Sequence, residues 1–126
     1  MTSFYVFMFA MALLIPVVMI IIGVVFIKRP PKKINGINGY RTKMSRKSQE
    51  TWDFAHHYFA RIFLWTGIFM MIPSAVVLFL IYGQDADTVG RTGGILEFIQ
   101  CVFLFLPILF TERALRKNFD ENGRRR

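Results

Sequence analysis

Residues 4–27 read FYVFMFAMALLIPVVMIIIGVVFI, and this stretch contains no charged side chain. A helix needs about 20 apolar residues to cross a hydrocarbon core of about 30 Å, so the stretch predicts a membrane-spanning helix. Pro16 removes one backbone donor near its middle, which predicts a kink. A secretory signal peptide is the alternative, but the residues before Phe4 carry no basic side chain and the apolar run is too long. We therefore expect a retained helix.

Two further apolar stretches follow, at residues 62–82 and 90–110. Gly67 and Pro73 interrupt the first of them, and membrane helices tolerate both residue types. The second stretch is continuously apolar only from Ile95, so it either extends back to about Val89 or stays short in a thinned bilayer. Of the 126 residues, 54% are apolar. We expect an all-α fold in which one domain, residues 1–126, forms an integral membrane bundle of three transmembrane helices.

The distribution of charge predicts the orientation of this bundle. Residues 28–61 hold nine basic and two acidic side chains, residues 83–94 sum to −1, and residues 111–126 sum to +3. Short loops rich in Lys and Arg stay in the cytoplasm. We therefore expect a cytoplasmic loop at 28–61 and a cytoplasmic tail at 111–126, with the amino terminus and the second loop outside.

The long loop opens with the basic sequence KRPPKK, residues 28–33, and its two prolines end the first helix. Each cation near the membrane surface attracts anionic lipid headgroups by about 1 kcal/mol. This sequence predicts membrane lipids as partners, through either specific headgroup binding or simple anchoring of the topology. Nucleic acid is not expected as a partner, because no other feature of the chain supports it.

The rest of the loop combines turns with a helical pattern. Two Asn-Gly pairs, Asn35-Gly36 and Asn38-Gly39, predict tight turns that need positive φ. From Ser45 or Ser48, either of which can cap a helix, apolar residues recur at helical spacing from Trp52. We expect a short interfacial amphipathic helix on the inner membrane face, running into the second span, with Trp52 at the level of the headgroups.

A few polar side chains are candidates for a site. Glu97 is the one carboxylate inside a span, Gln100 follows on the same face, and Arg91 precedes it. They form a candidate intramembrane polar site for a ligand or proton, unless Glu97 lies at the outer headgroups. Glu112, at the inner end of the third span, should meet a cation of the loop, and Arg41 is the preferred partner.

The sequence predicts neither a metal site nor catalysis. Asp53 and His57 are four residues apart and offer two metal ligands, but no third ligand follows, so we expect no metal and no cofactor. The lone Cys101 excludes an internal disulfide. No nucleophile with a supporting base and no phosphate-binding glycine loop is found, so we do not expect an enzyme.

Two stretches of the chain resemble the SdpI family. Residues 39–61, GYRTKMSRKSQETWDFAHHYFAR, resemble its central motif, and residues 111–123, TERALRKNFDENG, resemble its closing segment. The chain departs from the family pattern in having Arg46 in place of Met and Ala60 in place of Gly. The motif residues, which the resemblance implies for binding or for structure, are Gly39, Tyr40, Arg41, Thr42, Ser45, Trp52, Thr111 and Glu112.

The resemblance also implies a function. SdpI-like proteins are multi-pass proteins of the bacterial cell membrane that protect the cell from a secreted, membrane-active toxin peptide. Longer members also hold a transcriptional repressor at the membrane. We therefore expect a compact three-span member that binds or senses a toxin peptide. The alternatives are a structural or regulatory subunit that docks to a larger membrane complex, or a small transporter or lipid-handling enzyme that uses Glu97, or Arg41 with Glu112.

Overall fold

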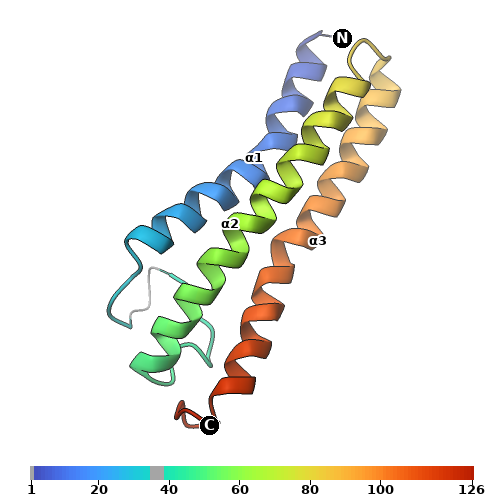
Figure 1. The fold of residues 1–126 in the computed structure, drawn as a ribbon. Coiled ribbons are helices and arrows are strands. Elements are labelled where there is room, and N and C mark those ends of the chain that lie inside the picture. The colour runs from blue at the N-terminus through green and yellow to red at the C-terminus, as the bar shows by residue number, and fades with distance from the viewer. Residues whose placement is uncertain (1, 35–38) are drawn as a thin grey trace.

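The structure is a computed structural model, and it describes residues 2–34 and 39–126. Within this part of the chain the fold consists of three helices, α1 (Thr2–Lys28), α2 (Gln49–Leu80) and α3 (Ala86–Asn118). Helix α2 runs antiparallel to both α1 and α3, and each helix contacts the other two (Figure 1). All three are long and apolar enough to cross a membrane, which confirms the predicted all-α fold with three candidate spans.

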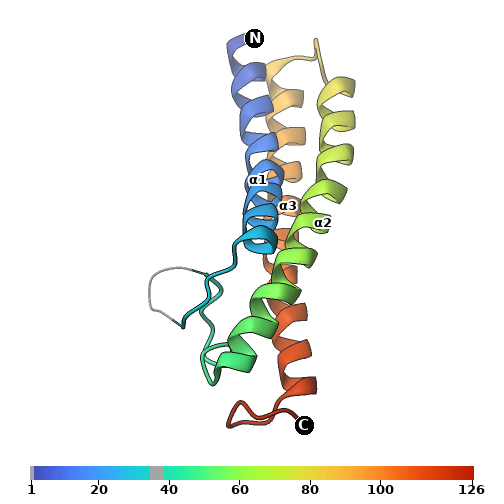
Figure 2. The ribbon, with the colours of Figure 1, turned by 60° about the vertical axis from the view of Figure 1, so that its left-hand side comes forward.

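The two ends of the bundle differ. At one end, the amino terminus lies beside the short connection between α2 and α3 (Figure 1). At the other end, which we call the basic end, lie residues 29–34 and 39–48 between α1 and α2, and the tail 119–126. Figure 2 shows that α2 and α3 continue beyond the last turn of α1 at this end. Their 32 and 33 residues span about 48 and 50 Å, against about 40 Å for the 27 residues of α1.

The predicted short interfacial helix is wrong. Residues from Gln49 onward are the first turns of α2 and continue into the apolar span without a break. Ser48 starts the helix with a capping box. Its hydroxyl accepts a hydrogen bond from the backbone N–H of Thr51, and the Thr51 hydroxyl accepts one from the backbone N–H of Ser48. No glycine or proline interrupts α2 before Gly67, so nothing in the backbone separates its first turns from the span.

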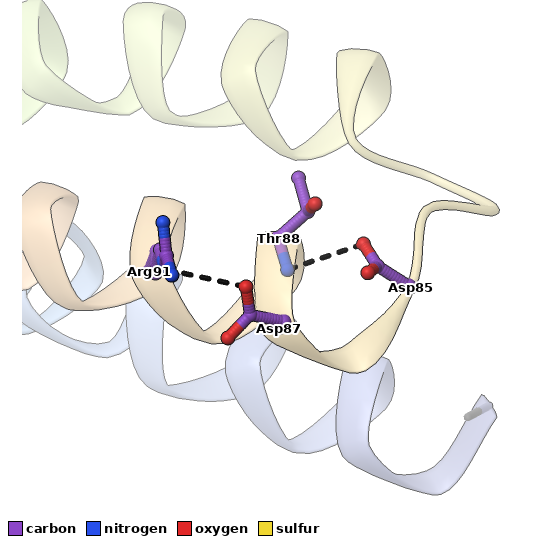
Figure 3. Close-up of polar contacts among 4 residues, drawn as sticks. All are labelled: Asp85, Asp87, Thr88 and Arg91. Atoms are coloured by element: carbon purple, nitrogen blue, oxygen red, sulfur yellow. Dashed lines mark hydrogen bonds and ion pairs between the residues drawn. The ribbon is translucent and has the colours of Figure 1, made fainter.

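The third helix takes the longer of its two predicted forms and begins before Val89. Asp85 caps α3 by accepting a 3.2 Å hydrogen bond from the N–H of Thr88 (Figure 3). In the first turn, Asp87 forms an exposed ion pair of 3.3 Å with Arg91, which lies one turn further along (Figure 3). An acid in the first turn also suits the positive end of the helix dipole. Caps therefore define the start of this helix, although its apolar run begins later.

Close packing and a polar junction around Gln100 contribute to holding the helices together. α1 bends about halfway along (Figure 1), and Pro16 is its one proline. Pro16 has no N–H, so the carbonyl of Ala12 loses its helical donor. The side-chain amide of Gln100 on α3 donates to this carbonyl at 2.7 Å and to the Ser74 hydroxyl of α2 at 2.8 Å. Nearby, Gly67 lets α2 approach the backbone of α1 so closely that a Cβ would lie 3.0 Å from the Pro16 carbonyl.

Candidate functional site

Tyr40 is the centre of a hydrogen-bond network at the basic end. Its hydroxyl lies 3.0 Å from Oε2 of Glu112 and 3.2 Å from the carbonyl oxygen of Ile108, and it donates to this pair of acceptors. Thr42 donates to the same carboxylate oxygen at 2.9 Å. The segment between α1 and α2, residues 29–34 and 39–48, is therefore tied to the C-terminal half of α3, and we call it the strap.

The environment of Tyr40 also affects its ionisation. Its side chain is 6% exposed. Burial, and then the adjacent carboxylate of Glu112, raise the pKa of the Tyr40 phenol far above its ordinary range. The hydroxyl therefore keeps its proton and stays a donor to Glu112 at any physiological pH. This part of the network behaves as a structural clamp and does not supply a general base.

His56 joins the strap to α2. The backbone N–H of Tyr40 donates to its Nε2 at 2.8 Å, and its Nδ1 lies 2.8 Å from the carbonyl oxygen of Trp52. The ring packs against the Trp52 indole, with centroids 4.3 Å apart, and against Phe26 of α1 at 5.7 Å. His56 therefore contacts the strap, α1 and its own helix. His56 is not among the site residues predicted from the sequence, although its position four residues after Trp52, on the same helix face, is a usable signal.

Gly39 is required where the strap passes His56. Its φ is +102°, a conformation that L side chains rarely adopt. A Cβ at this position would also collide with Nε2 of His56 and lie 2.9 Å from Cγ of Pro31. The predicted positive φ is thus confirmed for Gly39, whereas the predicted turns at Asn35-Gly36 and Asn38 lie outside the described residues.

Trp52 fastens the start of the strap. Its side chain is 0% exposed, and its indole N–H donates to the carbonyl of Pro31 at 2.6 Å. The strap and α2 enclose the ring, so Trp52 does not face lipid headgroups directly, and its level relative to the membrane surface stays a prediction. Its aromatic face packs on His56 instead of meeting lipid.

Serines and the tail complete the network. The Ser45 hydroxyl, fully buried, lies within 3.0 Å of the carbonyls of both Tyr40 and Thr42. Ser48 donates to the carbonyl of Gly123 at 2.8 Å, so the tail folds back onto the start of α2. The Arg125 guanidinium then lies over the Phe119 ring, 5.1 Å from its centroid.

The structure brings most of the motif residues together. Gly39, Tyr40, Thr42, Ser45, Trp52 and Glu112 all belong to the network around the strap. Thr111 is buried beside it and donates to the carbonyl of Pro107 at 2.7 Å. The partners found for Glu112 are the hydroxyls of Tyr40 and Thr42, and its pairing with Arg41 stays a prediction.

The candidate intramembrane polar residues have separate environments. Arg91 is exposed and pairs with Asp87. Gln100 is 1% exposed and belongs to the three-helix junction with Ser74 and Ala12. Oε1 of Glu97 is buried without a hydrogen-bond partner among the described residues. No hydrogen bond or ion pair found in the described part of the chain joins Arg91, Glu97 and Gln100 into one site.

Two of the grooves on the surface of the bundle bear on its function. The first, which we call the α2–α3 groove, has a volume of about 450 Å³ and a mostly aromatic and aliphatic lining that includes Trp65, Phe69, Phe103 and Phe110. The second, which we call the basic-end groove, has a volume of about 970 Å³ and lies between the last turn of α1, the start of the strap and residues 49–57 of α2.

Asp53 and His57, the two ligands that are too few to predict a metal site from the sequence, lie at the second of these grooves. In residues 2–34 and 39–126 no group of three or more His, Cys, Asp or Glu side chains is placed to hold a metal ion. The hydrogen-bonded clamp and these two grooves are the features from which a function is argued below.

Comparison with known proteins places this arrangement in a family. A family model described as the SdpI/YfhL protein family matches residues 32–111, from the strap to the C-terminal part of α3. The chain is 40% identical over 50 residues to the uncharacterized protein YfhL of Bacillus subtilis (strain 168). That match covers 40% of this chain and 46% of the length of YfhL. No solved structure matches the chain.

Proposed function

The chain belongs to the SdpI/YfhL protein family, and from this membership we propose that it protects a bacterial cell membrane by binding or sensing a membrane-active toxin peptide. Protection of this kind needs a site that a peptide can reach while it lies in the lipid. The family match includes α2 and most of α3, the two helices that form the lipid-facing α2–α3 groove.

The α2–α3 groove is the observation that carries the proposal. Its lining is almost entirely apolar, and Trp65 and Phe69 are 67% and 72% exposed at its edge. An amphipathic or apolar helix can bury its side chains in such a groove in place of lipid tails. Aromatic rings add large contact areas to an interface of this kind. A peptide held there would be kept from assembling into a membrane-damaging form.

The strap has a supporting role in this proposal. Through Tyr40, Thr42 and His56 it links the inner halves of α2 and α3, which continue directly into the walls of the groove. We place the basic end in the cytoplasm, because loops rich in Lys and Arg stay on that side. A transcriptional repressor or another membrane protein would then meet the chain at the strap and tail.

The test is a depolarisation assay in cells that are sensitive to an SdpI-type toxin peptide. Cells that express the chain should keep their membrane potential, as read with a potential-sensitive dye, at doses that depolarise cells without it. Phe69→Ala should lower, about tenfold, the highest toxin dose at which cells keep their membrane potential. The reason is that losing about 1.4 kcal/mol of ring burial weakens peptide binding about tenfold. Phe98→Ala is the matched control, since Phe98 is 71% exposed, lies on the same pair of helices and does not line the groove.

Two outcomes would contradict the proposal. The first is full depolarisation of cells in which the chain is inserted in the membrane. The second is equal loss of protection from Phe69→Ala and Phe98→Ala, which would remove the groove as the peptide site. A second protein recovered in fixed stoichiometry in mild detergent would favour the alternative of a regulatory subunit.

A further inference from the structure

The basic-end groove is built differently from the α2–α3 groove. At about 970 Å³ it is at the upper end of the range of small-molecule sites, about 300–1,000 Å³. Its walls carry charges of both signs, with Lys32 and Arg125 on the positive side and Glu50 and Asp53 on the negative side. A ligand that fits it must therefore be large, and it must offer both an anionic and a cationic group.

The four charges of the groove do not neutralise one another. Among the described residues no ion pair joins Lys32 or Arg125 to Glu50 or Asp53. Arg125 lies over the rings of Phe119 and Phe54, 5.1 and 5.9 Å from their centroids. Because these opposite charges line the basic-end groove without pairing, a ligand group that carries both a positive and a negative charge could interact with both sets.

Neighbouring contacts hold two sides of the hollow in place. The amide of Gln49 donates to Oδ1 of Asp53 at 2.8 Å and to the carbonyl of Lys32 at 2.6 Å. Asp53 and the backbone of Lys32 are thus fixed relative to each other across the groove. The Arg125 guanidinium is fixed separately, by the aromatic rings beneath it.

The apolar part of the groove continues into the lipid-facing surface of α1. Phe26 and Ile27, in the last turn of that helix, line the groove, and Ile27 is 46% exposed. About one turn before Ile27, Val24 is partly exposed on the same apolar helix. Since α1 is an apolar candidate span, its last turn lies where a membrane surface would be. The ligand therefore meets lipid tails on one side and water on the other.

We propose that the basic-end groove binds a zwitterionic phospholipid with a primary amine, of the phosphatidylethanolamine type. Its ammonium group lies against Asp53 and Glu50, and its phosphate lies against Lys32 and Arg125. Its acyl chains pass Phe26 and Ile27 along α1. A guanidinium binds phosphate through two parallel hydrogen bonds, which suits Arg125 to this role. This ligand differs from the anionic headgroups that the basic loop predicts, because the carboxylates would repel a headgroup without an amine.

The test is lipid retention by the purified full-length chain in native mass spectrometry. The protein is exposed to an equimolar mixture of phosphatidylethanolamine and phosphatidylglycerol of the same chain length. We expect at least about tenfold more retained phosphatidylethanolamine, the ratio that one well-placed charged contact of about 1.4 kcal/mol produces. Asp53→Asn should abolish this preference, and Lys32→Gln and Arg125→Gln should lower retention of both lipids.

Matched variants and a ligand without tails complete the design. Arg61→Gln and Glu121→Gln remove one exposed charge each at the same end, outside the groove, and should change neither retention nor preference. Glycerophosphoethanolamine, the same headgroup without tails, should bind at least about tenfold more weakly, because the apolar contacts are missing. Equal retention of the two lipids, unchanged preference in Asp53→Asn, or equal affinity for the tailless headgroup would overturn the proposal. Helix content by circular dichroism shows that each variant is folded.

Discussion

The backbone N–H of Tyr40 donates a hydrogen bond of 2.8 Å to Nε2 of His56, sixteen residues away along the chain. The other ring nitrogen, Nδ1, lies 2.8 Å from the carbonyl oxygen of Trp52. An acceptor at Nε2 and a donor at Nδ1 can exist together only in the neutral imidazole with its proton on Nδ1. This one side chain therefore fixes the path of the strap and is held in one tautomer by it.

Replacing His56 should release the strap. His56→Ala removes a buried ring and leaves the Tyr40 N–H and the Trp52 carbonyl without this partner, so we expect a loss of about 2–4 kcal/mol in the free energy of unfolding. Unfolding of the purified protein in a detergent series, followed by circular dichroism, measures it. The neighbouring exposed residue gives the control: His57→Ala should stay within about 0.5 kcal/mol of the parent. Equal losses in the two variants would contradict the role assigned to His56.

The three spans and the polar network were not equally predictable from sequence. Hydropathy is a local property, so the apolar run from Phe4 to Ile27 predicts its helix without any knowledge of its neighbours. Helix α3 is different, because its first two turns are polar, and its start depends on the cap that Asp85 provides. Sequence therefore predicted the spans well and the ends of the helices less well.

The continuity of α2 and the role of His56 depend on contacts between distant residues. The first turns of α2 have an apolar face that fits a membrane surface, and that pattern gave the wrong prediction of an interfacial helix. The strap and the tail cover this face instead: Pro31 accepts from Trp52, and Phe119 packs on Phe54 with centroids 5.4 Å apart. No local pattern shows which of two apolar surfaces, lipid or protein, will cover a helix face.

Gly39 allows the cost of a positive φ to be separated from the cost of steric overlap with neighbouring side chains. Gly39→Ala should destabilise the fold by about 2–4 kcal/mol, because the positive φ costs about 1 kcal/mol and the new Cβ would meet His56 and Pro31. Gly83 has a similar φ of +84° and open space around it, so Gly83→Ala isolates the backbone cost. Detergent unfolding should therefore rank the losses as Gly39→Ala above Gly83→Ala. The reverse order would show that the strap does not pass His56 as described.

Tyr40 makes the fold sensitive to alkali. Its folded pKa lies above that of the unfolded chain, so the folded state binds more protons in the alkaline range. Its contribution to stability is therefore complete below about pH 10, the ordinary tyrosine pKa, and is lost as pH rises beyond it. Tyr40→Phe should be less stable at neutral pH and should lose less stability on going to alkaline pH.

The measurement for Tyr40 is the difference between the parent and the variant. The two free energies of unfolding, measured in the same detergent series, should converge as the pH is raised. Tyr82→Phe is the control, since Tyr82 is 71% exposed at the opposite end of the bundle, and it should keep a constant difference from the parent. A Tyr40→Phe difference that stays constant with pH would contradict the buried, protonated phenol.

Gln100 and Pro16 should be energetically coupled. Gln100→Leu removes the donor to the Ala12 carbonyl, which Pro16 has left without its helical partner. We expect a loss of about 1–2 kcal/mol, the upper range for an interhelical hydrogen bond in a membrane protein. In Pro16→Ala, the new backbone N–H reaches Ala12, so the same Gln100→Leu change should cost less.

A double-mutant cycle measures this coupling directly. Detergent unfolding of the parent, both single variants and the double variant gives the interaction energy, which should be about 0.5–1.5 kcal/mol in favour of the Pro16–Gln100 combination. The control is the same cycle with Pro73→Ala in place of Pro16→Ala. Pro73 lies in α2, and the Gln100 amide does not bond to the carbonyl four residues before it. If the two changes in free energy of unfolding simply added, the bend in α1 and the polar junction would be independent. The Ala12 carbonyl would then be satisfied in another way and would gain nothing from the Gln100 amide.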